Sequence, residues 1–221
     1  MAKLIVLVHT VPPLVGVFDR LSAELLPGVK IMHILDEPLL ERIRQRGHLV
    51  PEDSERLSAH ATVAQEVGAS AVLVTCSTVS PAVDGMSAAA IPVMKIDAAM
   101  IEQAVDIGAR IGVIATNRTT MEPTKQMLVA QAEGAGKAIQ VELMLVEDAL
   151  PALLKGDGAT HDRLVREAVL DMMGRADVIV LAQASMARVL DVIPQAERKI
   201  PVLSSPHLAL GRLRDMLGNC C

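Results

Sequence analysis

Aromatic side chains are nearly missing from this 221-residue chain, which has one phenylalanine, Phe18, and neither tryptophan nor tyrosine. Proteins that read single-stranded nucleic acid stack bases on aromatic rings, and this chain has almost none to offer. Lysine and arginine form no basic run, and the net charge is −5, which disfavours a phosphate-backbone partner. We therefore expect no nucleic-acid partner.

Long apolar runs and cysteines are also scarce. The first apolar run, Leu4–Val8, is too short for a signal-peptide core or a membrane span. The three cysteines, Cys76 and the adjacent Cys220 and Cys221, predict neither a disulfide framework nor a zinc motif. The six histidines form no closely spaced pair, so we expect no metal site. These features predict a cytoplasmic protein with reduced thiols and no membrane partner.

Aliphatic residues are abundant, since 51% of the chain is hydrophobic, and a sizeable core can be buried. Short β-branched runs alternate with amphipathic segments, which is typical of an α/β fold with parallel strands and helices on both faces. The expected strands are 4–8, 30–35, 71–75, 91–96, 110–116, 139–146, 177–181 and 199–203. The expected helices are 14–26, 37–46, 51–67, 81–89, 98–105, 119–132, 149–154, 160–174, 185–192 and 207–217.

The two halves of the chain repeat one pattern. The strand that ends at Thr10 is matched by the strand that ends at Thr116, and the segment leading to Cys76 is matched by the one leading to Gln183. The two offsets are 106 and 107 residues, too similar for generic strand–helix alternation. Two similar lobes facing each other would gather these four residues around one cleft, a preferred place for small ligands.

The predicted architecture is two similar parallel-sheet α/β lobes related by a pseudo-twofold duplication, with the active-site cleft between them. The first lobe comprises residues 1–97 and 205–221, and the second comprises residues 98–204. His9-Thr10-Val11-Pro12 follows the first strand where a dinucleotide-binding protein has Gly-x-Gly-x-x-Gly, so a dinucleotide cofactor is not expected. A P-loop and a Gly-x-Ser-x-Gly motif are also absent from the sequence.

Cys76 stands at the expected carboxyl end of strand 71–75, where ligands bind in open α/β sheets. Ser77 and Thr78 follow, and Pro81 suits the first turn of a helix. A helix N-terminus at this point would lower the pKa of the thiol, and its N–H groups and hydroxyls would attract an anion. A buried, inert cysteine fits the local sequence equally well.

The equivalent turn of the second half reads Thr-Asn-Arg-Thr-Thr and begins at Thr116. Its backbone and hydroxyls could hold a carboxylate, and Arg118 could pair with one. Thr119 and Thr120 fit equally well as caps of the following helix. Thr10 is the symmetric partner of Thr116 and could serve the same purpose.

Three segments together resemble the aspartate/glutamate/hydantoin racemase superfamily, over essentially the whole chain. They are the Thr-Cys-Ser-Thr segment around Cys76, Gly112-Val113-Ile114-Ala115-Thr116, and Leu181-Ala182-Gln183-Ala184-Ser185-Met186. The resemblance implies a cofactor-free enzyme acting on a small carboxylate. In such enzymes two cysteines face each other, one removing the proton next to the carboxylate and the other returning it. A homo-oligomer is implied by the resemblance and by no residue of this chain.

The chain departs from that pattern at the second cysteine. Cys76 matches the first position, but Gln183 stands where the family has a cysteine, and an amide has no titrating proton. Racemisation by two thiols cannot run here as the family pattern has it, because inversion needs an acid and a base on opposite faces. His9 and His207, at strand ends, are candidates for the second proton, although each also fits a structural histidine. Ser185 is expected to complement Gln183.

Three functions stay open. The first is a racemase or isomerase acting next to the carboxylate of a small acid, with the Cys76 thiol or thiolate as acid/base. The second is a one-cysteine decarboxylase or lyase of the same superfamily, because one thiol suits proton transfer to one face. The third is a small-carboxylate binding protein in which Gln183 marks lost catalysis. The scarcity of aromatic residues favours a small aliphatic acid as the ligand in each case.

Overall fold

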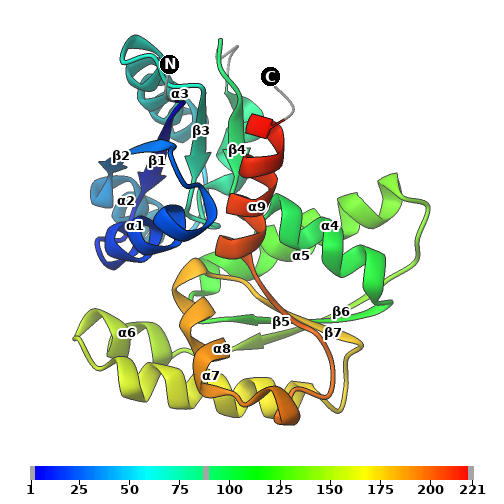
Figure 1. Ribbon diagram of the computed structural model, residues 1–221. Helices are drawn as coiled ribbons and strands as arrows, with labels where there is room; N and C mark the ends of the chain where they lie inside the picture. The colour runs from blue at the N-terminus through cyan, green and yellow to red at the C-terminus, as the bar shows by residue number, and fades with distance from the viewer. Residues whose placement is uncertain (1–2, 87–89, 219–221) are drawn as a thin grey trace. The chain divides into compact units, whose positions relative to one another are not determined.

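The computed structural model describes residues 3–86 and 90–218. It divides into two compact units, Met1–Ala98 with Pro206–Cys221, and Ala99–Ser205 (Figure 1). Cys220 and Cys221, and the end of the helix expected over 81–89, lie outside the described residues.

The first unit contains a four-stranded parallel sheet in the order β2-β1-β3-β4. Its strands are β1 (Leu4–His9), β2 (Lys30–Leu35), β3 (Ala71–Val74) and β4 (Val93–Lys95). Its helices are α1 (Pro13–Leu25), α2 (Glu37–Arg46), α3 (Pro51–Glu66), the 3₁₀ helix η1 (Ser80–Gly85) and α9 (Ser205–Gly218). Because β1 pairs with both β2 and β3, the chain leaves three neighbouring strands at the same carboxyl edge.

The two faces of this sheet have different roles. On one face, Val6 and Val8 of β1 pack with Leu39 of α2 and Leu57 of α3, and Cys76 belongs to the same buried cluster. Since successive side chains in a strand alternate between faces, His9 points to the other side. There it lies against Phe18 of α1, with ring centroids 5.5 Å apart. The single aromatic residue of the chain therefore packs beneath the end of the central strand.

The second unit repeats this arrangement, with the sheet order β6-β5-β7-β8. Its strands are β5 (Arg110–Ala115), β6 (Gln140–Leu145), β7 (Val178–Leu181) and β8 (Val202–Ser204). Its helices are α4 (Ala98–Ile107), α5 (Arg118–Gly134), α6 (Ala149–Leu154), α7 (Gly158–Met172), η2 (Ala184–Arg188), α8 (Val189–Val192) and η3 (Gln195–Glu197). At Gly112 of β5 an added Cβ would lie 2.5 Å from the Cγ of Met172, so glycine allows α7 to pack closely on the sheet.

The predicted fold class is confirmed, because each half forms a parallel sheet with helices around it. The segments after Cys76 and Gln183 differ from expectation, since each begins as a 3₁₀ helix. After Cys76 the chain turns too tightly for an α-helical start. The N–H groups of Val79 and Ser80 both donate to the Cys76 carbonyl, at 3.1 and 3.0 Å. A short 3₁₀ helix has a weaker N-terminal dipole than the α-helix that the sequence predicts.

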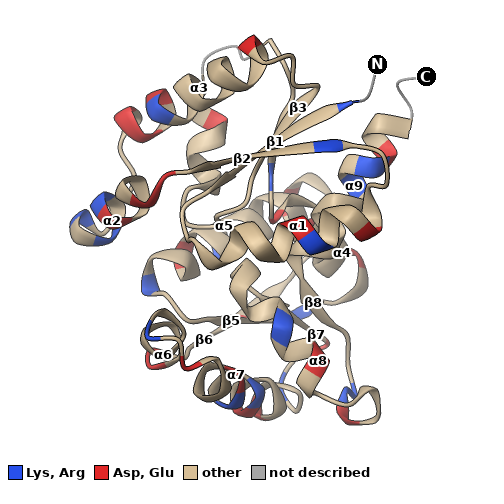
Figure 2. Ribbon diagram, turned by 60° about the vertical axis from the view of Figure 1, so that its left-hand side comes forward, with Lys and Arg blue, Asp and Glu red and all other residues tan. Residues whose placement is uncertain are grey.

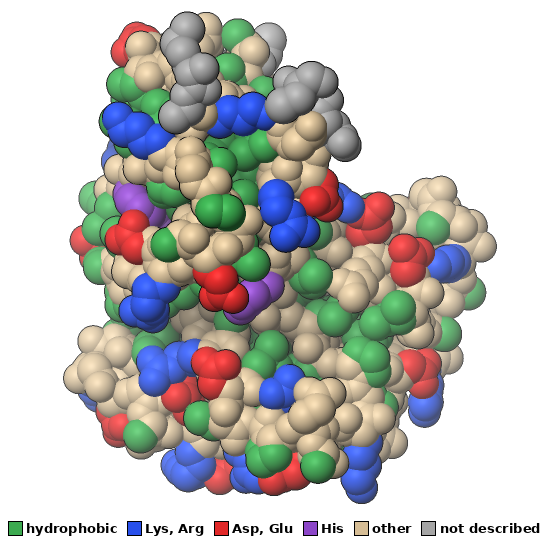
Figure 3. Space-filling model, viewed as in Figure 1, with side chains coloured by type: hydrophobic (Ala, Val, Ile, Leu, Met, Phe, Trp, Pro, Cys, Tyr) green, Lys and Arg blue, Asp and Glu red, His purple; other side chains and the backbone are tan. Residues whose placement is uncertain are grey.

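The ribbons of α2, α3 and α7 carry both basic and acidic residues, drawn in blue and red in Figure 2. The face drawn in Figure 3 likewise mixes acidic, basic and hydrophobic groups. Within the described ranges, no helix combines the length and the apolar character that crossing a membrane requires.

Candidate functional site

The carboxyl edge of the first sheet gathers the ends of β1, β3 and β4. Thr10 follows β1, Cys76 follows β3, and Asp97 follows β4. All three are buried, with exposed fractions of 2%, 8% and 1%. In open parallel sheets this is the edge at which ligands bind, so these three residues define the candidate site of the first unit.

Cys76 lies among groups that can donate hydrogen bonds to its sulfur. They are the hydroxyls of Thr10 and Thr78 and the backbone N–H groups of Thr78 and Val79. Burial nevertheless dominates and raises the pKa of the Cys76 thiol, while these donors only partly offset the rise. The lowered pKa expected from a helix N-terminus is therefore wrong for this thiol. At neutral pH Cys76 carries its proton.

Asp97 is a buried acid at the same edge that the sequence reasoning missed. Burial raises its pKa to about 6, against the opposing effects of Ser80, the Asp97 N–H, Lys95 and Ser77. A signal for it was present, because Asp97 directly follows the expected strand 91–96 and so shares the edge of Cys76. A carboxyl group with this pKa changes charge in the physiological range.

Buried polar atoms without a hydrogen-bond partner concentrate at the carboxyl edges of both sheets. Native proteins leave few such atoms unpaired, so a group of them marks bonding capacity for a ligand. Among the described residues eleven side-chain atoms are of this kind. Eight of them follow strand ends: the hydroxyls of Thr10, Ser77, Ser80, Thr119 and Ser205, both carboxylate oxygens of Asp97, and Nε2 of Gln183.

The hydroxyls of the first unit lie near their neighbours without completing hydrogen bonds. Thr10 is close enough to lower the pKa of Cys76, and Ser77 and Ser80 act in the same way on Asp97. None of these three hydroxyls reaches normal hydrogen-bond geometry. Their donors and acceptors are therefore available to a bound molecule.

Gln183 occupies the equivalent edge of the second unit. Its side-chain oxygen accepts a hydrogen bond from the backbone N–H of Thr116 at 2.9 Å, and the Thr116 hydroxyl lies 3.4 Å away. The amide oxygen is thus occupied, while the Nε2 donor is buried and unpartnered. Helix α5, which begins just after Thr116, is capped by the side chain of Asn117, which accepts a hydrogen bond from the N–H of Thr119 at 3.3 Å. Capping by the threonine hydroxyls is not needed, and the Thr119 hydroxyl has no partner.

Three other expected site residues lie outside these buried groups. Arg118 is exposed and pairs with Glu147, so its charge is already partly compensated. His207 is exposed near the start of α9, and Ser185 is partly exposed in η2. Thr120 is buried in the first turn of α5 and is not among the unpartnered residues.

His9 is completely buried, and both of its ring nitrogens have partners. Nδ1 lies 2.7 Å from the Thr75 hydroxyl, and Nε2 lies 2.8 Å from Nδ1 of His33. Burial, followed by the nearby His33, lowers the pKa of His9 to about 4, although Asp19 acts in the opposite direction. His9 is therefore neutral at pH 7 and has no free nitrogen to offer a substrate.

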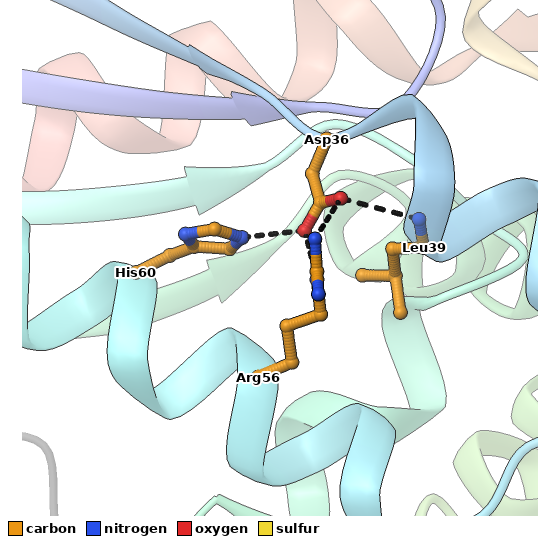
Figure 4. Close-up of polar contacts among 4 residues, drawn as sticks. All are labelled: Asp36, Leu39, Arg56 and His60. Carbon is orange, nitrogen blue, oxygen red and sulfur yellow. Dashed lines mark hydrogen bonds and ion pairs between the residues drawn. The ribbon is translucent and has the colours of Figure 1, made fainter.

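Asp36, after β2, is the centre of a polar cluster at this edge (Figure 4). It accepts hydrogen bonds from the Leu39 N–H at 3.1 Å, from Arg56 at 2.5 and 2.8 Å, and from His60 at 2.7 Å. Burial alone would raise the pKa of Asp36, but these donors outweigh it and lower the pKa to about 2. Because its oxygens are fully engaged, Asp36 serves to hold α2 and α3 to the sheet.

Two hollows in the second unit lie at the opposite, amino-terminal edge. One of about 220 Å³ is lined by Arg110, Glu142 and Arg175, among others, and one of about 320 Å³ includes Lys137. Their charged side chains already form ion pairs, such as Arg110 with Asp177 and Lys137 with Asp106. Neither hollow contains any of the unpartnered buried atoms, so neither offers the chemistry of the carboxyl edges.

The fold is shared with solved racemase structures. An aspartate racemase from Picrophilus torridus superposes with a TM-score of 0.71 and 12% identity, over 97% of this chain and 95% of its own. A glutamate racemase from Bacillus anthracis superposes with a TM-score of 0.72 and 18% identity, over 99% of this chain and 82% of its own. An allantoin racemase from Klebsiella pneumoniae superposes with a TM-score of 0.68 and 14% identity, over 99% of this chain and 89% of its own. Identities this low show the fold alone.

Sequence comparison carries the assignment further than the fold does. No curated protein matches the chain, but the family model described as Asp/Glu/Hydantoin racemase matches residues 16–213. This range includes Cys76, Thr116 and Gln183, and it runs from within α1 to within α9, so that it covers every strand of the two sheets except β1. The chain therefore belongs to the Asp/Glu/hydantoin racemase family.

Proposed function

We propose that the protein is a cofactor-independent isomerase that moves a proton at the carbon next to the carboxylate of a small acid, with Cys76 as acid/base. One observation carries this proposal. The buried hydroxyls of Thr10, Ser77 and Ser80 and both oxygens of Asp97 lack partners at the edge that holds Cys76. Unused bonding capacity of this kind beside a thiol suits a polar ligand rather than a packed core.

The proton transfer needs both forms of the thiol. As a thiolate, Cys76 takes the proton from the α-carbon, and the electron pair left behind spreads into the carboxylate as an enediolate. As a thiol, it returns a proton to the same face of that carbon, which exchanges the proton with retention. Inversion further needs a second acid that delivers a proton to the opposite face. The neighbouring donors, Thr10, Thr78 and the Val79 N–H, favour the thiolate, whereas burial favours the thiol. The resting state is then the proton-donating form.

Asp97 supports a substrate that also carries N–H groups. Both of its oxygens are buried without partners, and an ionised carboxylate accepts hydrogen bonds but donates none. A cationic ammonium or an amide-type N–H next to the reacting carbon is the complement of this group. Small amino acids and ureido acids fit this description. Aspartate and glutamate, the amino acids for which two of the racemases that share the fold are named, fit it, and allantoin, for which a third is named, carries ureido N–H groups.

Gln183 supports a second candidate, a decarboxylase or lyase that protonates one face only. Its oxygen is held by Thr116 and its Nε2 is a fixed donor, so it can bind an anion but cannot exchange a proton. With one titrating thiol, the product of decarboxylation receives its proton from Cys76. A binding protein without turnover is the third candidate, favoured only if no proton transfer is found.

Deuterium incorporation tests the proposal. We would incubate enantiopure aspartate, glutamate and allantoin, and separately prochiral 2-substituted malonates, in D₂O. Deuterium would be followed by NMR, and the optical purity of the recovered substrate or product by chiral chromatography. An isomerase incorporates deuterium with loss of optical purity, and a one-face enzyme incorporates it with optical purity retained. Cys76→Ala should abolish incorporation in either case. Incorporation that is equal in wild type and Cys76→Ala contradicts the proposal.

A further inference from the structure

Four side chains of the first unit form a continuous hydrogen-bonded line from the surface to the buried end of β3. Asp19 Oδ1 on α1 lies 3.0 Å from His33 Nε2 on β2. His33 Nδ1 lies 2.8 Å from His9 Nε2, and His9 Nδ1 lies 2.7 Å from Thr75 Oγ1. The Asp19 side chain is 61% exposed and that of His33 is 19% exposed, whereas Thr75 is buried. Solvent protons therefore have access to one end of the line only.

The hydrogen bonds of this line can be directed in two ways. In the first of these arrangements, the number of hydrogens on the ring fixes the charge of His33. The Thr75 hydroxyl can donate to the Val8 carbonyl, 3.0 Å away. His9 then donates from Nδ1 to Thr75 and must accept at Nε2. His33 must donate to His9 from Nδ1, and it must also donate to the Asp19 carboxylate from Nε2. Both nitrogens of His33 then carry hydrogen, so His33 is a cation paired with Asp19.

A second arrangement satisfies the same contacts with His33 neutral. His33 keeps the proton on Nε2 that it donates to Asp19, and its Nδ1 becomes an acceptor. His9 must then donate from Nε2 and accept at Nδ1, so its proton has changed nitrogen. The Thr75 hydroxyl turns away from Val8 and donates to His9. The two arrangements differ by one proton and by the direction of every bond between His33 and Thr75. The proton lost is the one on His9 Nδ1, as the Nδ1 proton of His33 passes to His9 Nε2. Because His9 Nδ1 faces the buried Thr75 hydroxyl, that proton reaches solvent only when the His9 ring leaves the line.

The second unit provides an internal control, because it has the same strand order without this line. The residue before Thr116 is Ala115, where the first unit has His9, and the residue before Gln183 is Ala182, where it has Thr75. Leu143 pairs with Val113 in β5–β6 as His33 pairs with Leu7 in β1–β2. Three apolar residues thus fill the equivalent places. The sheet folds without a polar line there, so the fold alone does not require one in the first unit.

The buried end of the line lies at the strand ends that hold the candidate site. Thr75 directly precedes Cys76, and His9 directly precedes Thr10. The Val8 carbonyl accepts both the backbone N–H of Thr75, at 2.9 Å, and the Thr75 hydroxyl. This carbonyl is where β1 and β3 are tied together just before Thr10 and Cys76. When the Thr75 hydroxyl turns away, the Val8 carbonyl loses one of the two hydrogen bonds that it accepts.

We propose that Asp19, His33, His9 and Thr75 form a proton-responsive positioning network that couples the protonation of His33 at the surface to the strand ends carrying Thr10 and Cys76. Asp19 on α1 and His9 on β1 are the ionisable groups that contact the His33 ring among the described residues. These four residues act through the strand ends and are not placed in contact with a substrate. The link to turnover rests on the proposed function, whereas the reversal of the hydrogen bonds does not.

The reversal can be read directly from the histidine rings. Long-range ¹H–¹⁵N NMR of the full chain labelled at histidine nitrogen distinguishes the proton on Nδ1 from the proton on Nε2. Between about pH 5 and pH 9 we expect His9 to change from the Nδ1–H to the Nε2–H form, with the same midpoint as the loss of charge on His33. A His9 ring that keeps one tautomer while His33 titrates overturns the proposal.

Surface substitutions separate the network from a general charge effect. Asp19→Asn removes the carboxylate that accepts from His33 Nε2 in both arrangements, so the shared midpoint should move to lower pH. Glu24→Gln changes the same charge at another exposed site of the same helix, α1, and should leave the midpoint in place. Equal shifts in the two variants contradict the proposal. Both sites are exposed, so folding should survive, and circular dichroism would verify it.

The coupling to Cys76 has its own readout. The rate of Cys76 alkylation by iodoacetamide should show an inflection at the His33 midpoint in the wild type, and Asp19→Asn should move that inflection with the midpoint. Thr75→Val, which removes the hydroxyl and keeps the shape, should abolish it. Tautomer reversal without such an inflection overturns the positioning role. Failure of the proposed function would instead appear as unchanged turnover in Cys76→Ala, with the tautomer reversal intact.

Discussion

The backbone N–H of Thr116 donates a hydrogen bond to the side-chain oxygen of Gln183 at 2.9 Å, and this bond fixes the orientation of the amide. The Nε2 group is left as a buried donor without a partner. At the position where the family pattern has its second thiol, the chain thus presents a fixed hydrogen-bond donor. The substitution removes a proton-transfer group and adds a group able to bind an anion.

Gln183→Cys should therefore restore the two-thiol residue pattern of the family. We expect the variant to racemise a substrate that the wild type labels on one face only, because a second titrating group becomes present. Chiral chromatography of the recovered substrate measures this gain. Gln183→Ser, of similar size to cysteine but without a titrating proton in this range, is the matched control. Equal loss of optical purity in both variants would contradict the assignment of residue 183.

The Cys76 thiol should react slowly at neutral pH. Burial raises its pKa above the ordinary value of about 8.5, so the thiolate is scarce at pH 7. The rate of alkylation by iodoacetamide should keep rising above pH 9 in the folded protein, and unfolding in urea should return the midpoint to about 8.5. Alkylation of Cys220 and Cys221 is removed from the measurement by Cys→Ser changes at those positions. A midpoint below pH 8 for Cys76 alkylation in the folded protein would contradict this prediction.

Asp97 should lower stability as pH rises. Its folded pKa is raised to about 6 while an unfolded aspartate titrates near 4, so the folded state binds more protons between these values. The contribution of Asp97 to stability is then highest below pH 4, falls between about pH 4 and pH 6, and is level above. Asp97→Asn should be more stable than wild type at pH 8 by about 1–3 kcal/mol, measured by urea unfolding.

The same Asp97→Asn variant should lose function while it gains stability, because an amide does not replace a carboxylate that accepts from N–H groups. Asp84→Asn, an exposed aspartate of η1, serves as control. A variant whose stability advantage over wild type is the same at pH 4 and pH 8 would show that Asp97 does not titrate as described.

Asp36 should have the opposite pH dependence. Its folded pKa is lowered to about 2, so its contribution is present above pH 4 and is lost as pH falls from about 4 to 2. Asp36→Asn should destabilise the protein at pH 7 by about 3 kcal/mol, because Arg56 and His60 lose their shared partner. The cost should shrink toward pH 2. Glu37→Gln, at the exposed next position, should change stability by less than about 0.5 kcal/mol.

The fold could be predicted well from the sequence because its signals are local. The β2 strand, the α2 helix and the α6 helix begin and end where the patterns of hydrophobicity and proline predict. The repeat of the two halves identified equivalent strands in sheets of the same order. The 3₁₀ starts of the segments after Cys76 and Gln183 could not be told from α-helical starts, because proline and hydroxyl residues suit the first turn of either kind.

The site was predicted less completely because burial and register decide it. A helix N-terminus suggested a low pKa for Cys76, yet the loss of hydration in the core is the larger effect. The line from Asp19 to Thr75 has no spacing signature, since its members come from four elements and meet only through the pairing of β1 with β2 and β3. Asp97 could have been found, because it follows a strand at the edge of Cys76. Whether the predicted residues bind a substrate stays a prediction.

The role of Cys76 is tested most sharply by the rate of α-proton exchange in Cys76→Ala, with binding of the same acid measured by calorimetry. We predict that the variant folds, binds the acid within about a few-fold of wild-type affinity, and loses exchange by at least about 10²-fold, the usual contribution of a positioned acid/base group. Exchange at the wild-type rate in Cys76→Ala would contradict the role of this thiol.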